Sequence, residues 1–494
     1  MESMSELVPA GVPTFAVVGK VNMGKSSVLA TLLEVDDDAV IRISSTPGET
    51  TRCQILPVEF DEREMLRFID TPGFARPLET MRAIEELHRE RDQVGTPDLA
   101  TIRAFVERYR GSGNFEDEVQ LLTPLLEGAG LLYVIDPSKP LRDAFVAEME
   151  ILRWTGRQRM AVLNEKEDEL AFRDDWKNRL GSYFNLVRTF DAHEARFGER
   201  RRLLRSLLEI EEDHREVIEE TIVYLEREWD QRREESVEAL MEFLEDALTF
   251  RIEKRVEERD LEVAHRREQL GKELTKRYYE GIAKKEKSAV KKILHLYRHH
   301  LAQVEVEVTD LTAIDLEQEE TWKKWGLSRG QLTWAGGAAG GASGLGVDAM
   351  LGFASHGLGS LIGAVGGATA AFFKGNELPD LAIDLQKGVK LAQGEGSALK
   401  LGPPNNQNFV WILLDSFFGH YQSIIRRAHG NRSELILKNA ELESGLVQRI
   451  KGEQKRTLQK WFTSCLKGKP DRDLEPQVYK GLSDFFKELA LDPD

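Results

Sequence analysis

The sequence predicts an α/β domain built on a mostly parallel sheet, followed by a large all-α region that contains a Gly/Ala-rich hairpin. Three observations predict this fold class. From residue 14 to about 195, apolar β-branched runs alternate with helical patterns. A glycine-rich loop, residues 19–26, joins the first apolar run to a helical pattern. Beyond residue 200 apolar residues recur at helical spacing among many charged ones, and no proline occurs between Pro140 and Pro379.

The bulk properties limit both the architecture and the partners. At 494 residues the chain exceeds what one hydrophobic core usually serves, so we expect two or three domains. A net charge of −17 repels phosphate backbones and disfavours nucleic acid as the main partner. The two cysteines, Cys53 and Cys465, stand in no metal-ligand spacing and predict reduced thiols in a cytoplasmic protein. Residues 1–13 are expected to form an N-terminal tail without a secretion signal.

The α/β domain is expected over residues 14–199. Its polar residues follow the strands at the edge where parallel sheets bind ligands, namely at Gly19, Asp70, Asp136, Asn164 and Asp191. A helical insertion is expected over residues 75–128. It is either the part that moves with a nucleotide-sensing loop or a surface insertion, and the sequence leaves both open. The six candidate strands span residues 15–19, 53–60, 65–70, 131–136, 160–164 and 186–190.

The second half of the chain divides into three regions. Residues 200–333 predict long charged helices, arranged as a coiled-coil stalk or as a bundle of shorter helices. Residues 334–373 are rich in glycine and alanine, and Asp348 is their only formally charged residue. They predict a helical hairpin, which either contacts a membrane or packs inside the protein. Residues 374–494 predict a C-terminal helical region.

The loop after the first strand has the spacing of a phosphate-binding loop: Gly19, four residues, then Gly24, Lys25 and Ser26. Its glycines let the backbone approach the phosphates, and N–H groups from Met23 through Ser27 can wrap around them. Lys25 can reach the β and γ oxygens as a point charge. The Ser26 hydroxyl can ligate Mg²⁺.

Two further motifs complete the pattern of a nucleoside triphosphatase. Asp70 and Gly73 lie in the run DTPG at the end of the third strand, where the carboxylate can hold Mg²⁺ through water and the glycine N–H can meet the γ-phosphate. The second is the run TPGETTR, which lies between the phosphate loop and DTPG. It offers Thr50 and Thr51, whose hydroxyls can complete the magnesium shell when a γ-phosphate is present.

These residues resemble a known family. The runs GKVNMGKS, PGETTR and DTPG are similar to the GTP-binding domain of the Era-like branch of translation-factor-class GTPases. The insert, the glycine-rich hairpin and the run LGPPNNQNFVWILLD resemble bacterial GTPases with a C-terminal domain of unknown function. The resemblance implies a P-loop GTPase domain that binds GTP or GDP with Mg²⁺.

The resemblance also implies roles for single residues. Thr51 would sense Mg²⁺ and the γ-phosphate. Asn22 stands where potassium-activated members use an asparagine to coordinate K⁺, which then acts as an arginine finger would; a hydrogen-bonding role in the turn is the alternative. Phe74 replaces the water-orienting Gln of Ras-type enzymes, so we expect slow intrinsic hydrolysis. The residues expected to act in hydrolysis are Asn22, Lys25, Thr51 and Gly73.

The base-binding motif departs from the family pattern Asn-Lys-x-Asp. Asn164 ends its strand as expected, but Glu165, Lys166 and Glu167 follow it, so the lysine is shifted by one position. Glu167 would accept from guanine N1 and N2, and the pair Asp191 and Ala192 would offer a backbone N–H to guanine O6. Selectivity for GTP over ATP therefore stays open.

The sequence thus predicts a Mg²⁺-dependent and potassium-activated GTP-hydrolysing switch, coupled to a helical, membrane-associated half of the chain. A dynamin-like membrane-remodelling GTPase and an RNA or ribosome-assembly GTPase are the alternatives. The expected partners are the nucleotide, a protein effector of unknown identity, a membrane contacted through residues 334–373, and a second copy of the chain in a homodimer. The expected location is the cytoplasm, on or in the inner membrane.

Overall fold

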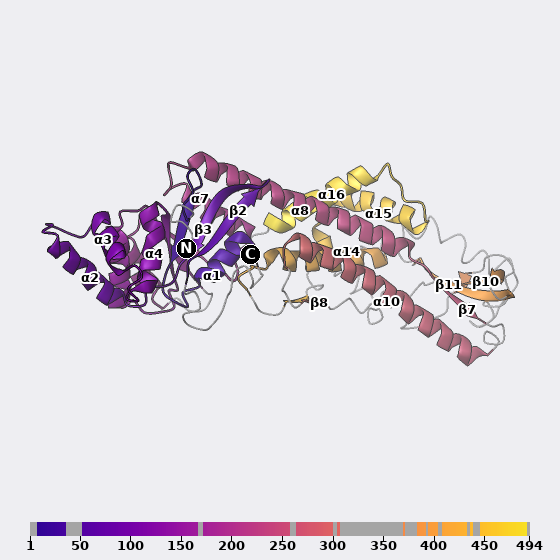
Figure 1. The fold of residues 1–494 in the computed structure, drawn as a ribbon. Coiled ribbons are helices and arrows are strands. Elements are labelled where there is room, and N and C mark those ends of the chain that lie inside the picture. Colours follow the sequence, from indigo (N-terminus) through magenta and orange to yellow (C-terminus); the bar gives the residue numbers. More distant parts are fainter. Residues whose placement is uncertain are drawn as a thin grey trace. The chain divides into compact units, whose positions relative to one another are not determined.

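A computed structural model describes the chain as two compact units (Figure 1). Unit 1 comprises Met1–Gln231, Tyr297–Ala302 and Ile425–Ser433, and unit 2 comprises the rest of the chain. The described residues are 7–35, 52–165, 171–256, 263–299, 304–306, 369–370, 383–391, 394–403, 408–431, 435–437 and 445–491.

Unit 1 is built on a six-stranded sheet in the order β2-β3-β1-β4-β5-β6. Only β2 and β3 pair antiparallel; every other neighbouring pair is parallel. This confirms the mostly parallel sheet that the alternating pattern predicts. The strands are β1 (Thr14–Val18), β2 (Gln54–Phe60), β3 (Arg63–Asp70), β4 (Gly130–Ile135), β5 (Arg159–Asn164) and β6 (Leu186–Phe190).

Helices cover both faces of this sheet because the strands are apolar on both sides. In β1, Phe15 and Val17 join one buried cluster and Ala16 and Val18 join the other, as the two-residue period of a strand requires. The first cluster is completed by α1 (Lys25–Leu33), α7 (Phe197–Leu207) and the start of α8 (Arg215–Thr249). The second is completed by α2 (Pro77–Glu90), α3 (Leu99–Tyr109), α4 (Glu116–Glu127), α5 (Asp143–Trp154) and α6 (Arg173–Leu180).

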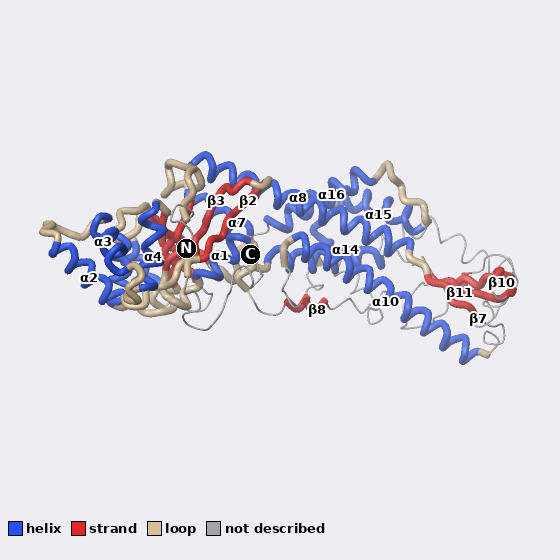
Figure 2. Tube along the Cα trace, in the orientation of Figure 1, coloured by secondary structure: helices blue, strands red, loops and turns tan. Residues whose placement is uncertain are grey.

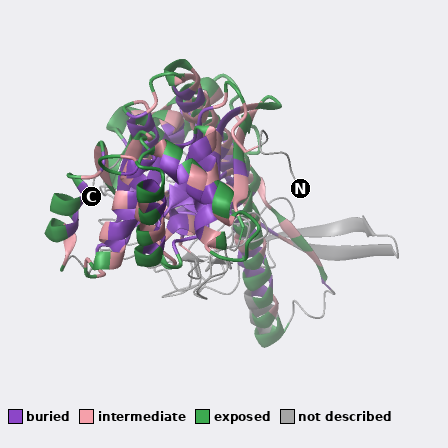
Figure 3. Ribbon diagram, turned by 60° about the vertical axis from the view of Figure 1, so that its left-hand side comes forward, coloured by how far each residue is buried: buried purple, intermediate pink, exposed green. Residues whose placement is uncertain are grey.

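Unit 2 is largely helical, in agreement with the pattern of charged and apolar residues. The described helices of the chain have buried and exposed faces, as amphipathic packing requires (Figure 3). Aromatic residues fill part of its core: the ring of Phe418 lies 4.7 Å from that of Phe485. The helices are the end of α8, α10 (Ala264–Leu296), α14 (Asn408–Arg426), α15 (Gly452–Leu466) and α16 (Glu475–Leu491), with a 3-10 turn at Leu446–Arg449.

The prediction of an all-α second half was incomplete, because unit 2 also contains strands (Figure 2). Strands β7 (Ile252–Val256), β11 (Gly394–Leu401), β10 (Ile383–Leu391) and β9 (Thr369–Ala370) form an antiparallel sheet in that order. The alternation of apolar residues at 383, 385, 389 and 391 was the strand signal, and it is typical of a sheet with one covered face. Strand β8 (Val304–Val306) pairs with β12 (Leu435–Leu437).

The Gly/Ala-rich hairpin predicted over residues 334–373 lies outside the described residues, except for the two residues of β9. Residues 307–333 of the predicted charged helices also lie outside them. Among the helices that the structure does describe, none combines the length and the apolar composition needed to cross a membrane.

Candidate functional site

The loop between β1 and α1 has a backbone that requires glycine. Gly24 precedes the first turn of α1 with a φ of 86°, in the left-handed region. A β-carbon there would lie 2.1 Å from Nδ2 of Asn164. Asn22 also has a positive φ, 64°, which asparagine tolerates. The sequence therefore folds into a tight turn that presents backbone N–H groups and the N-terminus of α1 to one space.

Lys25, the first residue of α1, and Asp70, the last residue of β3, are both buried beside this loop. Lys25 Nζ donates to the carbonyl oxygen of Gly19 at 3.0 Å, and the lysine is 7% exposed. Burial lowers the pKa of Lys25, and the nearby Asp70 and Glu148 carboxylates oppose that shift. Burial likewise raises the pKa of Asp70, against the effect of Lys25 and of a hydrogen bond from Ser26. The two buried groups thus lie close enough beside the loop to influence each other's pKa.

The Ser26 and Asp70 oxygens suit a magnesium ion. Ser26 Oγ lies 3.3 Å from Oδ2 of Asp70, and both are hard oxygen ligands. The second carboxylate oxygen, Oδ1, is buried and has no hydrogen-bond partner among the described residues. An unpaired carboxylate oxygen is costly to bury, and a bound divalent cation would compensate for it.

Gly73 lies against the same loop, at the end of the run that follows β3. A β-carbon on it would lie 2.9 Å from the oxygen of Gly19 and 3.1 Å from the nitrogen of Val21, so the two backbones are in direct contact. Thr71 fixes this approach by donating through Oγ1 to the oxygen of Val17 at 2.8 Å. Phe74 is 2% exposed and packs in the core beside α2–α4.

Asn164 connects the phosphate loop to the segment after β6. Its Nδ2 donates to the oxygen of Met23 at 3.4 Å, and its Oδ1 accepts from the nitrogen of Ala192 at 3.0 Å. The Ala192 N–H that the resemblance assigns to guanine O6 therefore binds Asn164 in this structure. Asp191 accepts through Oδ1 from the nitrogens of His193 and Glu194, so its carboxylate closes a turn.

The remaining predicted site residues divide into three groups: buried, exposed and outside the described residues. Met23 and Ser27 are buried, and the sulfur of Met23 accepts from the nitrogen of Asp136 at 3.4 Å. Asn22 is exposed, and its backbone oxygen accepts from Lys139 Nζ at 2.5 Å. Four residues lie outside the described part of the chain: Thr50, Thr51, Lys166 and Glu167.

The sequence interpretation missed one pair of residues on α4. Oε1 of Glu118 accepts from the nitrogens of Ala75 and Arg76 at 3.0 and 2.7 Å, directly after Gly73 and Phe74. Gln120 binds Cys53 twice: its side-chain oxygen accepts from the Cys53 nitrogen at 3.3 Å, and its backbone oxygen lies 3.4 Å from the sulfur. One helix of the insertion therefore holds the chain after both predicted phosphate-sensing loops.

A signal for Glu118 was present in the sequence. It is three, four and seven positions before Leu121, Leu122 and Leu125, which are all fully buried, so it lies on the apolar face of its helix. A carboxylate on such a face needs a buried partner, and the backbone N–H groups of residues 75 and 76 supply it.

Residues 177–478 match a family model described as a domain of unknown function, DUF3482, and this match spans more than half of the chain. The chain belongs to the DUF3482 family. Residues 14–164 of this DUF3482 protein also match the family of 50S ribosome-binding GTPases. The matched range includes the phosphate loop and Asn164. The N-terminal domain of the protein is a P-loop GTPase domain.

Solved structures with a similar GTP-binding domain include Era in complex with MgGDPNP and a fragment of 16S ribosomal RNA. That chain is 19% identical over 40% of the DUF3482 protein and 56% of Era, with a TM-score of 0.27. A variant of Aquifex aeolicus Era bound to GDP·AlF4⁻ is 21% identical over the same shares, with a TM-score of 0.26. A GTP-binding protein from Sulfolobus solfataricus in complex with GDP is 19% identical over 45% and 55%, with a TM-score of 0.22. The DUF3482 protein thus spans a little over half the length of each.

Proposed function

We propose that this protein is a Mg²⁺-dependent GTP-hydrolysing switch. One observation carries the proposal: the segments after β1 and β3 meet at one loop, where they bring together Lys25, Ser26, Asp70 and Gly73. Lys25 would offset charge on the β and γ oxygens, and the Gly73 N–H would position the γ-phosphate. Ser26 and Asp70 would hold Mg²⁺, which neutralises the charge that develops on the transferred phosphoryl group. The GTPase family match supports guanine as the base.

The contacts of α4 support the switch part of the proposal. In P-loop GTPases the two loops that contact the γ-phosphate change order when it leaves. Glu118 and Gln120 bind the chain directly after both corresponding segments here. A shift of either segment would therefore break or strain a hydrogen bond to α4. We infer that the insertion responds to the state of the nucleotide.

Potassium activation through Asn22 is the finer part of the proposal. The Asn22 backbone oxygen is bound by Lys139, whereas its carboxamide has no hydrogen-bond partner among the described residues. A turn-stabilising side-chain bond, the alternative role, is thus not formed within this part of the chain. An amide oxygen that has no partner among these residues, and that lies beside the phosphate loop, is a suitable ligand for K⁺.

Nucleotide turnover tests the proposal directly. We would measure hydrolysis of GTP and of ATP with Mg²⁺, each in K⁺ and in Na⁺, for the natural protein, Lys25→Ala and Asn22→Ala. GTP turnover should fall about 100-fold or more in Lys25→Ala, because one main charge contact to the transferred group is lost. The matched control is Lys460→Ala on the exposed face of α15 in unit 2, which should keep full turnover.

Three outcomes would contradict parts of the proposal separately. If the natural protein neither binds a GTP analogue nor hydrolyses GTP, the switch is wrong. If the natural protein hydrolyses GTP at the same rate in K⁺ and in Na⁺, and Asn22→Ala hydrolyses it at that rate too, potassium has no part in hydrolysis. Faster turnover of ATP than of GTP would overturn guanine as the base.

A further inference from the structure

A short turn from the far end of the chain, residues 428–431, is part of unit 1 and contacts the GTPase domain at α1. The Gly430 nitrogen donates to Oγ1 of Thr31 at 2.8 Å, across 399 positions of sequence. The same Thr31 hydroxyl donates to the oxygen of Ala192 at 2.7 Å. Thr31 is fully buried in α1, whose first turn carries Lys25 and Ser26. One hydroxyl thus joins the turn, α1 and the segment after β6.

The contact leaves no space for a side chain at residue 430. A β-carbon on Gly430 would lie 2.5 Å from the oxygen of Ala192 and 2.8 Å from the oxygen of Ser27. Both are backbone atoms, so neither can move without shifting the loop or the helix to which it belongs. The turn therefore packs tightly between α1, which follows the predicted phosphate loop, and the segment at Ala192 that is expected to contact the base.

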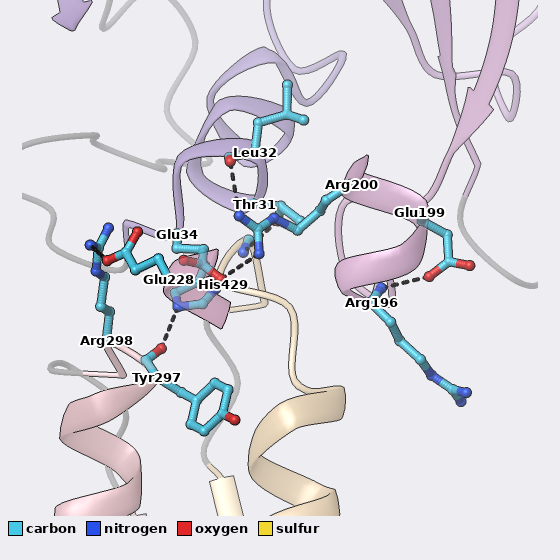
Figure 4. Close-up of polar contacts among 11 residues, drawn as sticks. Thr31, Leu32, Glu34, Arg196, Glu199, Arg200, Glu228, Tyr297, Arg298 and His429 are labelled. Atoms are coloured by element: carbon cyan, nitrogen blue, oxygen red, sulfur yellow. Dashed lines mark hydrogen bonds and ion pairs between the residues drawn. The ribbon is translucent and has the colours of Figure 1, made fainter. Parts of the chain in front are cut away.

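Neighbouring residues hold the turn in place. His429 stacks on His299, with ring centroids 4.3 Å apart. Its Nε2 lies 3.0 Å from the oxygen of Tyr297 (Figure 4). Burial, reinforced by His299, holds the pKa of His429 well below its usual range, so the ring is neutral and donates to that carbonyl. The turn is thus fixed by a stacked ring pair and a buried hydrogen bond.

A buried ion pair fixes the end of α1 beside the turn. Arg200 of α7 pairs with Glu34, and both side chains are at most 6% exposed. Arg200 also donates to the oxygen of Leu32 at 3.1 Å, which satisfies one of the free carbonyls at the helix end. With this end fixed, a displacement of the turn is passed to the Thr31 hydroxyl rather than absorbed by fraying of α1.

We propose that Thr31 and Gly430 are positioning residues that set the lifetime of bound guanine nucleotide. The proposal rests on the proposed function. Hydrogen bonds run without a gap from Gly430 to Thr31, Ala192, Asn164 and Met23, so the turn, the base-side segment and the phosphate loop form one connected set. Withdrawing Gly430 leaves the Ala192 segment free to move away from the base. A partner that pulls residues 428–431 away from α1 would thereby release nucleotide.

The test is the dissociation rate of a fluorescent GDP, measured by chasing with excess GDP in the full-length protein. Thr31→Val keeps the shape of the side chain and removes the hydroxyl, and Gly430→Ala forces the turn outward. Both should raise the dissociation rate about tenfold, since each disrupts a buried hydrogen bond. Thr31→Ser, which keeps the hydroxyl, and Gly198→Ala, whose β-carbon meets nothing within 4 Å, should stay within twofold of the natural protein.

The kinetic constants separate positioning from mere stability. In Thr31→Val the dissociation rate should rise by a larger factor than turnover at saturating GTP changes, because Thr31 and Gly430 are not among the residues expected to contact the phosphates. Unchanged dissociation in Thr31→Val would overturn the inference, even if Gly430→Ala proved too unstable to purify. Equal acceleration in Thr31→Ser would overturn it too. If the natural protein binds no GDP, the proposed function fails; if it binds GDP and the variants match it, only this inference fails.

Discussion

Gly24 shows how closely two single residues can depend on each other. The 2.1 Å between its missing β-carbon and Nδ2 of Asn164 cannot be relieved by rotating a long side chain. Asn164 is short, fully buried and hydrogen-bonded at both ends of its amide. A side chain at residue 24 would therefore displace Asn164 from Met23 and Ala192 together.

We expect Gly24→Ala to abolish nucleotide binding while the protein stays folded. Gly11 provides the control, because it also has a positive φ, 81°, but nothing lies within 4 Å of its β-carbon. Gly11→Ala should cost only about 1 kcal/mol of backbone strain and keep its affinity. The measurement is the affinity for a GTP analogue together with the melting temperature. Equal affinities in the two variants would show that displacement of Asn164 has no effect.

At the scale of single elements, α4 should influence turnover through one carboxylate. Glu118→Ala leaves the nitrogens of Ala75 and Arg76 without a partner, which costs about 1–3 kcal/mol. We expect turnover at saturating GTP to fall about tenfold. Glu118→Gln keeps an acceptor oxygen and should recover most of the rate, and Glu116→Ala, on the exposed side of the same helix, should not change it. A rate in Glu118→Gln as low as in Glu118→Ala would assign the effect to charge instead.

Two helices of unit 2 share a buried acid. Glu286 of α10 is fully buried, accepts a hydrogen bond from Ser416 of α14, and lies 3.6 Å from Nδ1 of His420. Burial raises the pKa of Glu286 to about 7, against the opposing effect of the Ser416 hydroxyl. The folded protein therefore binds a proton that the unfolded chain, with an ordinary value near 4.5, has released.

Because the raised pKa makes the folded state bind more protons between about pH 4.5 and 7, the free energy of unfolding should fall as pH rises through that window. The slope is at most about 1.4 kcal/mol per pH unit. Glu286→Gln removes this titration, so its advantage over the natural protein should grow from pH 5 to pH 8. Midpoints of urea unfolding at several pH values measure it, with the exposed Glu280→Gln as control. Parallel pH profiles for Glu286→Gln and the natural protein would contradict the prediction.

For the whole molecule, membrane contact through residues 334–373 stays a prediction from composition. We expect the full chain to float with liposomes in a density gradient, and a deletion of 334–373 to remain at the bottom. Leu361→Lys keeps the length of the segment and should also weaken flotation, because a charge is costly in the apolar interior of a bilayer. If the full chain does not float with liposomes of zwitterionic or of anionic lipids, the segment packs within the protein instead.

Features whose signals lie within a few neighbouring residues could be predicted from the sequence, whereas contacts between distant segments could not. The parallel sheet and the meeting of Lys25, Ser26 and Asp70 rest on periodicity and on short motifs, which the chain displays within a few residues. Glu118 was recognisable as a charge on an apolar helix face. Its partners, the backbone nitrogens of residues 75 and 76, could not be predicted. The sequence around Thr31 does not predict its contact with Gly430, because a contact across 399 positions depends on how both segments pack. The two longest strands of unit 2 were missed because residues 374–494 were assigned to one helical region, although apolar residues alternate at 383, 385, 389 and 391.

Unit 1 is discontinuous in sequence, and this affects how it is made. A ribosome that adds about 5–20 residues per second needs roughly 20–80 s to travel from Thr31 to Gly430. All six strands of the sheet have left the ribosome by then, so the GTPase domain folds first and receives its last turn late. If Gly430 sets the lifetime of bound nucleotide, a nascent chain exchanges nucleotide quickly until the turn at Gly430 has left the ribosome. Long retention of nucleotide would then mark chains in which this turn has docked on α1.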